Sequence, residues 1–170
     1  QYMSFEKIRP EDIDGNVFKM IGDDWMLVTA ETEKGVNTMT ASWGGMGVLW
    51  NKPVAFVFIR PQRYTFEFTE SSDVMTLSFF GGEKREALKI CGSLSGRDCP
   101  KIEKAGLTPY RLGDGLVTFE GAHLAVCAKK IYTDMIKPEN MLCGDIMKNY
   151  PKNDFHKTYI AEICDVYKGI

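Results

Sequence analysis

The chain has 170 residues, a length that one domain with a sizeable core accommodates, so we expect a single domain spanning residues 1–170. Hydrophobic residues make up 44% of it and charged residues 26%, values that argue against a disordered, fibrous or membrane-embedded chain. With 21 Lys and Arg against 23 Asp and Glu, the net charge is -2, so there is no global basic field that would recruit nucleic acid or anionic lipid.

Location is predicted from apolar runs and cysteines. The longest apolar run, PVAFVFI at residues 53–59, is far shorter than the about 20 residues that span a bilayer, and the N-terminal QYMSFEKIRP lacks the apolar core of a signal peptide. The five cysteines form no CxxC pair, which favours reduced thiols over disulfides or a zinc site. We therefore expect a cytoplasmic protein without a membrane partner.

The first half of the chain reads as strands followed by a helix. Residues 25–32, WMLVTAET, favour a strand, and Gly35 predicts a turn into a second strand that begins near Asn37. The apolar run KPVAFVFIRP, bounded by prolines, is typical of a strand buried on both faces, as in a barrel. The following QRYTFEFTESS has helical spacing, which places Tyr64 and Phe68 on one face.

The second half of the chain predicts further short strands and short helices. Residues 74–82 predict a strand that ends at a glycine pair, and residues 83–95 predict a short helix. Residues 115–133 predict two strands interrupted at Gly121. Residues 137–151, with a proline near each end, predict a helical stretch, and residues 156–168 predict a last strand. Short strands without regular strand–helix alternation indicate a mainly β fold with short helices, a β-barrel instead of a doubly wound parallel sheet.

The sequence lacks three motifs of known chemistry: a dinucleotide-binding loop, a nucleophile elbow and a metal-ligand spacing. The run GGMGVLW resembles a dinucleotide loop, but Trp50 replaces its last glycine and a β-rich run follows in place of a helix. In GSLSG, Leu94 stands where a nucleophile elbow requires serine. His123 and His156 have no metal-ligand spacing, so no metal site is expected.

The segment NTMTASW, residues 37–43, combines small and hydroxylated side chains with a tryptophan. The small or hydroxylated members are Thr38, Thr40, Ala41 and Ser42. They would let a planar ring lie close to the backbone, whose N–H groups bond ring carbonyls and nitrogens, while Trp43 forms a wall. The alternative is a barrel strand with small residues at a tight bend.

Two further segments carry cations and hydroxyls. In IRPQRYT a helix start is expected after Pro61, and its polar members are Arg60, Arg63, Tyr64 and Thr65. Together with free helix N–H groups these residues suit a phosphate, and the alternative is a solvated basic turn. In SGRDCPK the candidates are Ser95, Arg97 and Lys101. The alternative there is a helix cap, with Asp98 as N-cap and Pro100 in the first turn. The three segments together suit a phosphorylated aromatic ligand.

The order of these motifs carries a resemblance. NTMTASWG, IRPQRYTFEF, TLSFF, SGRD, GLTP and YIAEI follow one another along the chain, and this series resembles the flavin reductase-like family, including flavoredoxins. The resemblance covers about residues 25–167 and implies an FMN-binding split β-barrel. Ala161 stands where the family usually has glycine, Gly121 interrupts the usual FEEA, and Pro100 replaces an acidic residue. These departures concern local strand geometry and remove no expected ligand.

The resemblance also implies the roles of individual residues. Residues 37–43 are expected at the flavin ring, Thr65 and Lys101 at the FMN phosphate, and His156 near the flavin. The full set of expected cofactor-binding residues is Asn37, Thr38, Met39, Thr40, Ala41, Ser42, Trp43, Arg60, Tyr64, Thr65, Ser95, Lys101 and His156. No side chain is expected as a catalytic acid or base, because the flavin N5 carries the chemistry.

The function implied is that of an FMN-dependent oxidoreductase or electron carrier. We expect a homodimer with one flavin per subunit near the interface, and electrons from transiently bound NAD(P)H or from a redox protein. The alternative is a flavin-binding module without turnover, such as a sensor, store or scaffold. The sequence leaves donor, acceptor and redox potential open.

Overall fold

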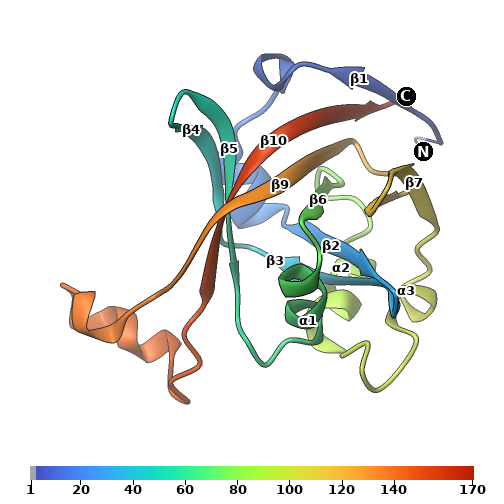
Figure 1. Cartoon of the computed structure of the whole chain (residues 1–170). Helices are drawn as coiled ribbons and strands as arrows, with labels where there is room; N and C mark the ends of the chain where they lie inside the picture. Colours follow the sequence, from blue (N-terminus) through green and yellow to red (C-terminus); the bar gives the residue numbers. More distant parts are fainter. Residues whose placement is uncertain (1–2) are drawn as a thin grey trace.

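Two hairpins, two long strands and two further strands form the eight-stranded central sheet of the computed structural model, which describes residues 3–170 (Figure 1). β2 (Met26–Thr32) and β3 (Gly35–Ala41) pair across a two-residue turn, as predicted, and β4 (Gly45–Leu49) and β5 (Lys52–Ile59) form the second hairpin. The remaining strands are β1 (Phe5–Ile8), β6 (Val74–Phe79), β7 (Pro109–Gly113), β8 (Leu116–Phe119), β9 (Leu124–Met135) and β10 (Lys157–Gly169). The antiparallel order in the sheet is β3-β2-β6-β9-β10-β5-β4, with β1 paired to β10.

The core lies inside this curved sheet. Inward residues of β2, β5, β6, β9 and β10 form one apolar cluster that includes Val28, Val57, Leu77, Val126 and Tyr159. The register of β9 against β10 shifts between Ile160 and Ala161, and such a bulge bends the strand and increases its twist. Ala161 is fully buried at this shift, so the residue that departs from the family pattern lies where the sheet curves.

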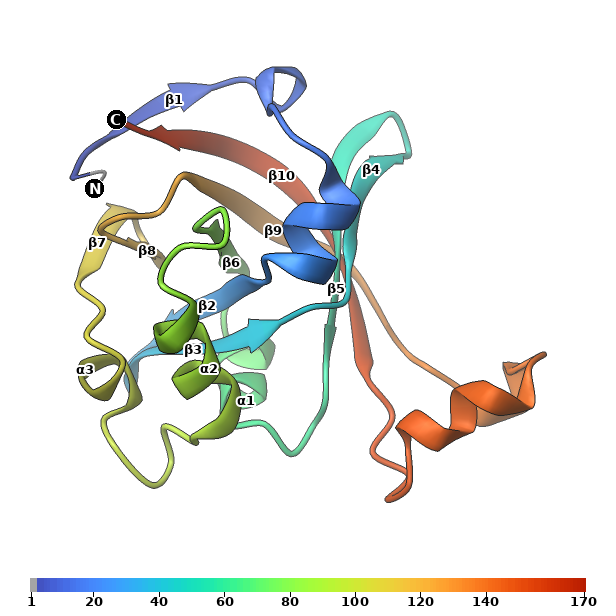
Figure 2. The same ribbon diagram turned by 180° about the vertical axis from the view of Figure 1, so that it is seen from behind.

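α1 (Tyr64–Ser71) and α2 (Arg85–Ser93) pack against opposite faces of the β2–β3 hairpin, and α3 (Lys101–Lys104) packs against α2 (Figures 1 and 2). α1 and α2 agree with the two helices expected from sequence, and the rings of Tyr64 and Phe68 pack edge to face at 5.0 Å. α3 is a single turn. Its N-cap is Pro100, so the reading of Asp98 as a helix cap is wrong. The turn begins one residue after this proline, whose fixed φ suits a helix start.

The continuous helical stretch expected over residues 137–151 is also wrong. This part of the chain holds two separate 3-10 helices, η3 (Pro138–Asn140) and η4 (Gly144–Asn149). Short helices depend on packing of an apolar face, and Leu142 is fully exposed here while Ile146 is 42% exposed. We refer to residues 136–155 as the arm, because they project away from the barrel in both views (Figures 1 and 2).

Several short strands and helices are not predicted by the sequence. β1, β4 and β7 were not expected, nor were the 3-10 helix η1 (Pro10–Asp12) and the π-helix η2 (Lys19–Asp23). The glycine-rich β4 lacks the β-branched alternation by which strands are recognised, and it forms because β5 supplies its hydrogen bonds. No helix within residues 3–170 is long and apolar enough to cross a bilayer.

Candidate functional site

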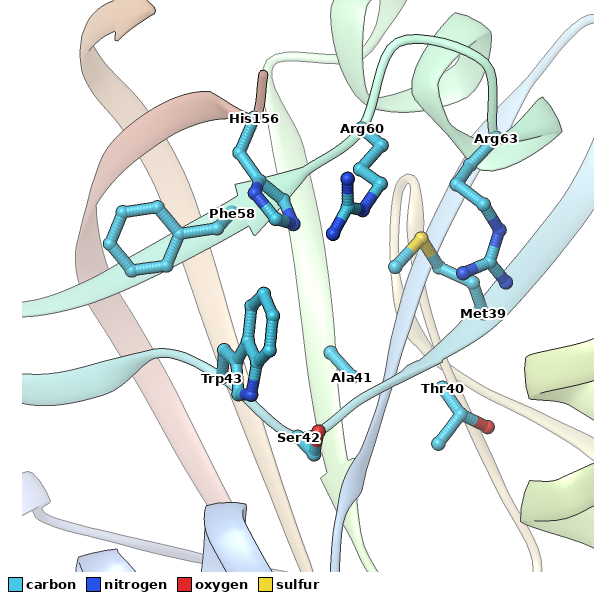
Figure 3. A pocket seen from close by; sticks show the side chains of 9 residues that line it. All are labelled: Met39, Thr40, Ala41, Ser42, Trp43, Phe58, Arg60, Arg63 and His156. Carbon is cyan, nitrogen blue, oxygen red and sulfur yellow. The ribbon is translucent and has the colours of Figure 1, made fainter. Parts of the chain in front are cut away.

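A pocket of about 170 Å³ opens where β3 ends (Figure 3). Its lining comes from β3 and the residues after it, from β5 and the segment leading to α1, and from the residue directly before β10. The lining residues are Met39, Thr40, Ala41, Ser42, Trp43, Phe58, Arg60, Arg63 and His156. Segments more than 100 residues apart thus meet in one place, since β5 pairs with β10.

A glycine sets the path of the chain directly after the pocket residue Trp43. Gly44 has φ +146°, and a Cβ atom there would lie 2.8 Å from the carbonyl oxygen of Phe56. Any other side chain would therefore collide with the β5 backbone. The sharp change of direction after Trp43 leaves that indole 49% exposed at the pocket, with its ring 5.5 Å from the imidazole of His156.

His156 and Arg60 form one side of the pocket. Figure 3 shows the imidazole between the Phe58 ring and the Arg60 guanidinium. Arg60 pairs with Asp154 at 2.9 Å and donates to the carbonyl of Asn149 at 2.9 Å, so its charge is compensated within the protein. Burial, and after it the charge of Arg60, lower the pKa of His156 to about 4.

Two further cations are not compensated in this way. Arg63 Nη2 and Lys101 Nζ donate to the same carbonyl oxygen, that of Cys91, at 3.3 and 3.1 Å. Neither forms an ion pair with any carboxylate of residues 3–170, although Lys101 is only 4% exposed. Burial, and then Arg63, lower the pKa of Lys101 to about 8, and burial lowers the pKa of Arg63. A pair of partly desolvated cations without a counter-ion is suited to bind an anion.

Hydroxyl and amide groups lie beside this cation pair. Thr65 Oγ1, fully buried at the start of α1, donates to Asn37 Oδ1 at 2.8 Å, and Asn37 lines a second pocket together with Lys101. Gly96 lies directly against the Asn37 side chain, since a Cβ atom on Gly96 would lie 2.1 Å from Asn37 Nδ2. The SGRD loop can approach β3 this closely only because this residue is glycine.

The structure brings together most, but not all, of the expected site residues. The ring-site residues from Met39 to Trp43, with Arg60 and His156, line the first pocket, while Asn37, Thr65 and Lys101 gather at the cation pair. The Thr40 hydroxyl itself donates to the Leu88 carbonyl and so joins β3 to α2.

The remaining candidates, Thr38, Tyr64 and Ser95, line neither of these two pockets. Thr38 is fully buried and bonds Thr29 Oγ1 at 2.8 Å on the other face of β3. The Tyr64 ring packs under Arg97, which pairs with Glu67. Ser95 accepts a hydrogen bond from the Arg97 backbone and shapes the loop.

Two lining residues were absent from the expected set. Arg63 belongs to the basic segment that suits a phosphate but not to the expected cofactor-binding set, and its position directly before α1 is the signal that points to it. Nothing in the sequence marks Phe58 as a pocket residue, because it belongs to an apolar run that predicts a fully buried strand. No three His, Cys, Asp or Glu side chains of residues 3–170 form a group that suits a metal ion, and the five cysteines are free.

The chemistry of the arrangement follows from its two ends. One end offers small side chains, backbone and aromatic walls, which suit a flat ring. The other end offers the Thr65 hydroxyl and two cations, Lys101 and Arg63, that have no carboxylate partner among residues 3–170. These groups suit a phosphate. A single elongated ligand with a planar ring and a terminal anion would contact both.

The antiparallel sheet and the pocket at the end of β3 define a split β-barrel. Residues 21–168 match the family described as flavin reductase like domain, and the chain belongs to this family. This confirms the resemblance found in the sequence and the predicted fold class.

Similar proteins agree with this placement. The FMN-binding domain of a flavin reductases-like enzyme from Shewanella baltica OS155 superposes with a TM-score of 0.68 at 17% identity, covering 99% of this chain and 79% of that one. Flavoredoxin from Methanosarcina acetivorans superposes with a TM-score of 0.64 at 20% identity, covering 96% and 75%. An uncharacterized protein of Aeropyrum pernix is 27% identical over 136 aligned positions, in an alignment that covers 76% of this chain and 50% of that protein. The chain thus spans about half the length of the curated relative it matches.

Proposed function

We propose that this protein is an FMN-binding oxidoreductase of the flavin reductase type, which passes electrons from NAD(P)H or a redox partner through bound FMN. The observation that carries the proposal is the pair Lys101 and Arg63, two cations on one carbonyl oxygen without a carboxylate, beside a pocket suited to a flat ring. Membership of the flavin reductase-like family and the names of the FMN-binding and flavoredoxin neighbours support it.

The residues present fit this cofactor. Lys101, Arg63 and Thr65 would hold the phosphate, because a dianion would compensate the two cations that the protein leaves unpaired. Residues 39–43 and His156 would hold the ring, since this part of the pocket combines accessible backbone with aromatic walls.

When bound, FMN supplies reversible acceptance of a hydride or of single electrons at N5. The task of the chain is to bind and orient the ring and to shield it from water. Trp43 and Phe58 provide apolar walls, and Arg60, compensated by Asp154, places a fixed positive charge beside them. None of these side chains need exchange a proton with the substrate.

We further propose that the protein works as a homodimer in the cytoplasm. Large apolar side chains are exposed on the β4–β5 hairpin and on the arm, including Val48 (76%), Trp50 (54%) and Leu142 (100%). Such a surface favours burial against a second copy.

The test starts from purified protein. We expect a flavin absorbance spectrum after addition of FMN, tighter binding of FMN than of riboflavin or FAD by calorimetry, and oxidation of NADH or NADPH under anaerobic and aerobic conditions only when FMN is present. Equal affinities for riboflavin and FMN would contradict the phosphate assignment. Tight FMN binding without oxidation of either nucleotide would favour a redox-protein donor or a flavin-binding module without turnover.

A further inference from the structure

Tyr150 is a buried tyrosine that the function proposed above does not use. It is the residue that follows η4, where the arm returns to the barrel, and it is only 5% exposed. Its ring lies 4.8 Å from that of Phe155 and 4.9 Å from the Arg60 guanidinium, so both of these neighbours hold it in place. Its hydroxyl lies 2.7 Å from Nδ1 of His156.

The direction of this hydrogen bond follows from the partners of each group. Nδ1 of His156 is the only partner of the Tyr150 hydroxyl among residues 3–170. If the imidazole donated from Nδ1, the buried phenol proton would have no acceptor among residues 3–170, and an unpaired buried donor is unfavourable. The phenol therefore donates, and in the neutral imidazole the proton must then lie on Nε2.

Nε2 is the atom left for a ligand. It makes no hydrogen bond with any residue from 3 to 170, while the imidazole lines the pocket beside Trp43 and Phe58. An N–H group held in this way is a donor of fixed position. Its natural partner is a carbonyl oxygen or an unprotonated ring nitrogen of the bound molecule.

We propose that Tyr150 is a positioning residue, which bonds Nδ1 of His156 and so presents Nε2–H to the pocket as a fixed donor for an acceptor atom of the ring ligand. The ligand-facing part rests on the proposed function, whereas the assignment of the proton rests on the described residues alone.

The surroundings keep this donor neutral. The charged or titratable groups that face His156 are Arg60 at the end of β5 and Tyr150 and Asp154 from the arm, and Trp43 and Phe58 are its aromatic neighbours. Burial and Arg60 disfavour the imidazolium. The donor should thus keep one form throughout the neutral range, and its strength should not vary with pH there.

The first experiment needs no flavin. The chain has two histidines, so long-range proton–nitrogen NMR spectra of labelled protein, assigned with His123→Gln, report the tautomer of His156 directly. We expect the Nε2–H form between about pH 6 and pH 9, and a mixture of the two forms in Tyr150→Phe, which keeps the ring packing. Tyr132→Phe, on β9 before the arm, is the matched control, because its hydroxyl bonds Asp134 instead. The Nδ1–H form in the wild type, or an unchanged tautomer in Tyr150→Phe, would overturn the proposal.

The second experiment asks whether a ligand uses the donor. Loss of one neutral hydrogen bond weakens binding by roughly threefold to tenfold. We expect such a loss of affinity for both FMN and riboflavin in Tyr150→Phe and in His156→Leu. His156→Gln, whose amide can offer an N–H, should recover part of the loss. Unchanged affinity in Tyr150→Phe would refute the ligand-facing role. If the wild type binds neither flavin, the proposed function fails, and the NMR result still decides what Tyr150 does.

Discussion

Lys101 and Arg63 donate hydrogen bonds to one carbonyl oxygen, that of Cys91, from two segments that lie 38 positions apart in the chain. Burial, and then the charge of Arg63, lower the pKa of Lys101, while burial, and then the charge of Arg60, lower the pKa of Arg63. A bound anion would favour the charged form of both side chains. This makes the pair the most sensitive place to test the proposed phosphate site.

Removal of the lysine is the first test. Lys101→Ala should weaken FMN binding by roughly tenfold to a hundredfold, because a hydrogen bond to a charged group contributes about 1.5–3 kcal/mol. Riboflavin affinity should be unchanged, since riboflavin has no phosphate. Lys104→Ala, in the same helical turn, is the matched control. Equal losses for FMN and riboflavin would show that Lys101 supports the barrel and not the phosphate.

Thr65→Val should cost less than Lys101→Ala, because it removes a neutral group. It also leaves Asn37 Oδ1 without its donor, so some loss of stability is expected. Because both side chains would contact one anion, the double variant should show coupling in a calorimetric mutant cycle. Strict additivity would mean that the two residues act at separate places.

FMN affinity should depend on pH through Lys101. The pKa of this group in the free protein is about 8, and a bound phosphate favours the charged form. Affinity for FMN should therefore fall above pH 8, by about tenfold at about pH 9, while Lys101→Ala should show no such decline. Riboflavin, titrated in parallel, corrects for ionisation of the ring. A flat FMN curve in the wild type would argue against contact with Lys101.

The stability of the protein should fall in acid because of His156. Its pKa is lowered from 6.5 to about 4, so below about pH 6.5 the unfolded chain binds a proton that the folded chain does not. From about pH 7 to about pH 5 this should remove about 2 kcal/mol from the free energy of unfolding. Urea titrations should show a smaller decline in His156→Gln, with His123→Gln as the control. If the free energy of unfolding declines equally with pH in the wild type, His156→Gln and His123→Gln, then His156 is not a buried neutral group.

Light scattering at micromolar concentration should give the mass of a dimer. Leu142→Glu on the arm or Val48→Glu on β4 should shift the mass toward that of a monomer, because a charge would enter an apolar interface. Ile170→Glu, at the end of the chain and 54% exposed, should not. A monomeric wild type with flavin bound would contradict the dimer.

The sequence determined the elements whose signals are local. A turn at Gly35, the helix that places Tyr64 beside Phe68, and the break at Gly121 each follow from a few neighbouring residues, and each is present in the structure. The motif series was sufficient to predict the family and the split barrel. The two segments with mixed signals, residues 98–101 and 137–151, were misread, because short helices form only where other elements support them.

Only the tertiary structure decided which of the candidates share a site. Adjacent residues of a strand point to opposite faces, so the fold turns Thr38 into the interior while its neighbours Asn37 and Met39 line pockets. Pairing of β5 with β10 brings Phe58 to His156, and packing of α2 offers the Cys91 carbonyl to both Arg63 and Lys101. The return of the arm brings Tyr150 to His156. These contacts join distant segments, and the local sequence of one segment does not indicate which other segment it contacts. Strand register and helix packing depend on the whole barrel.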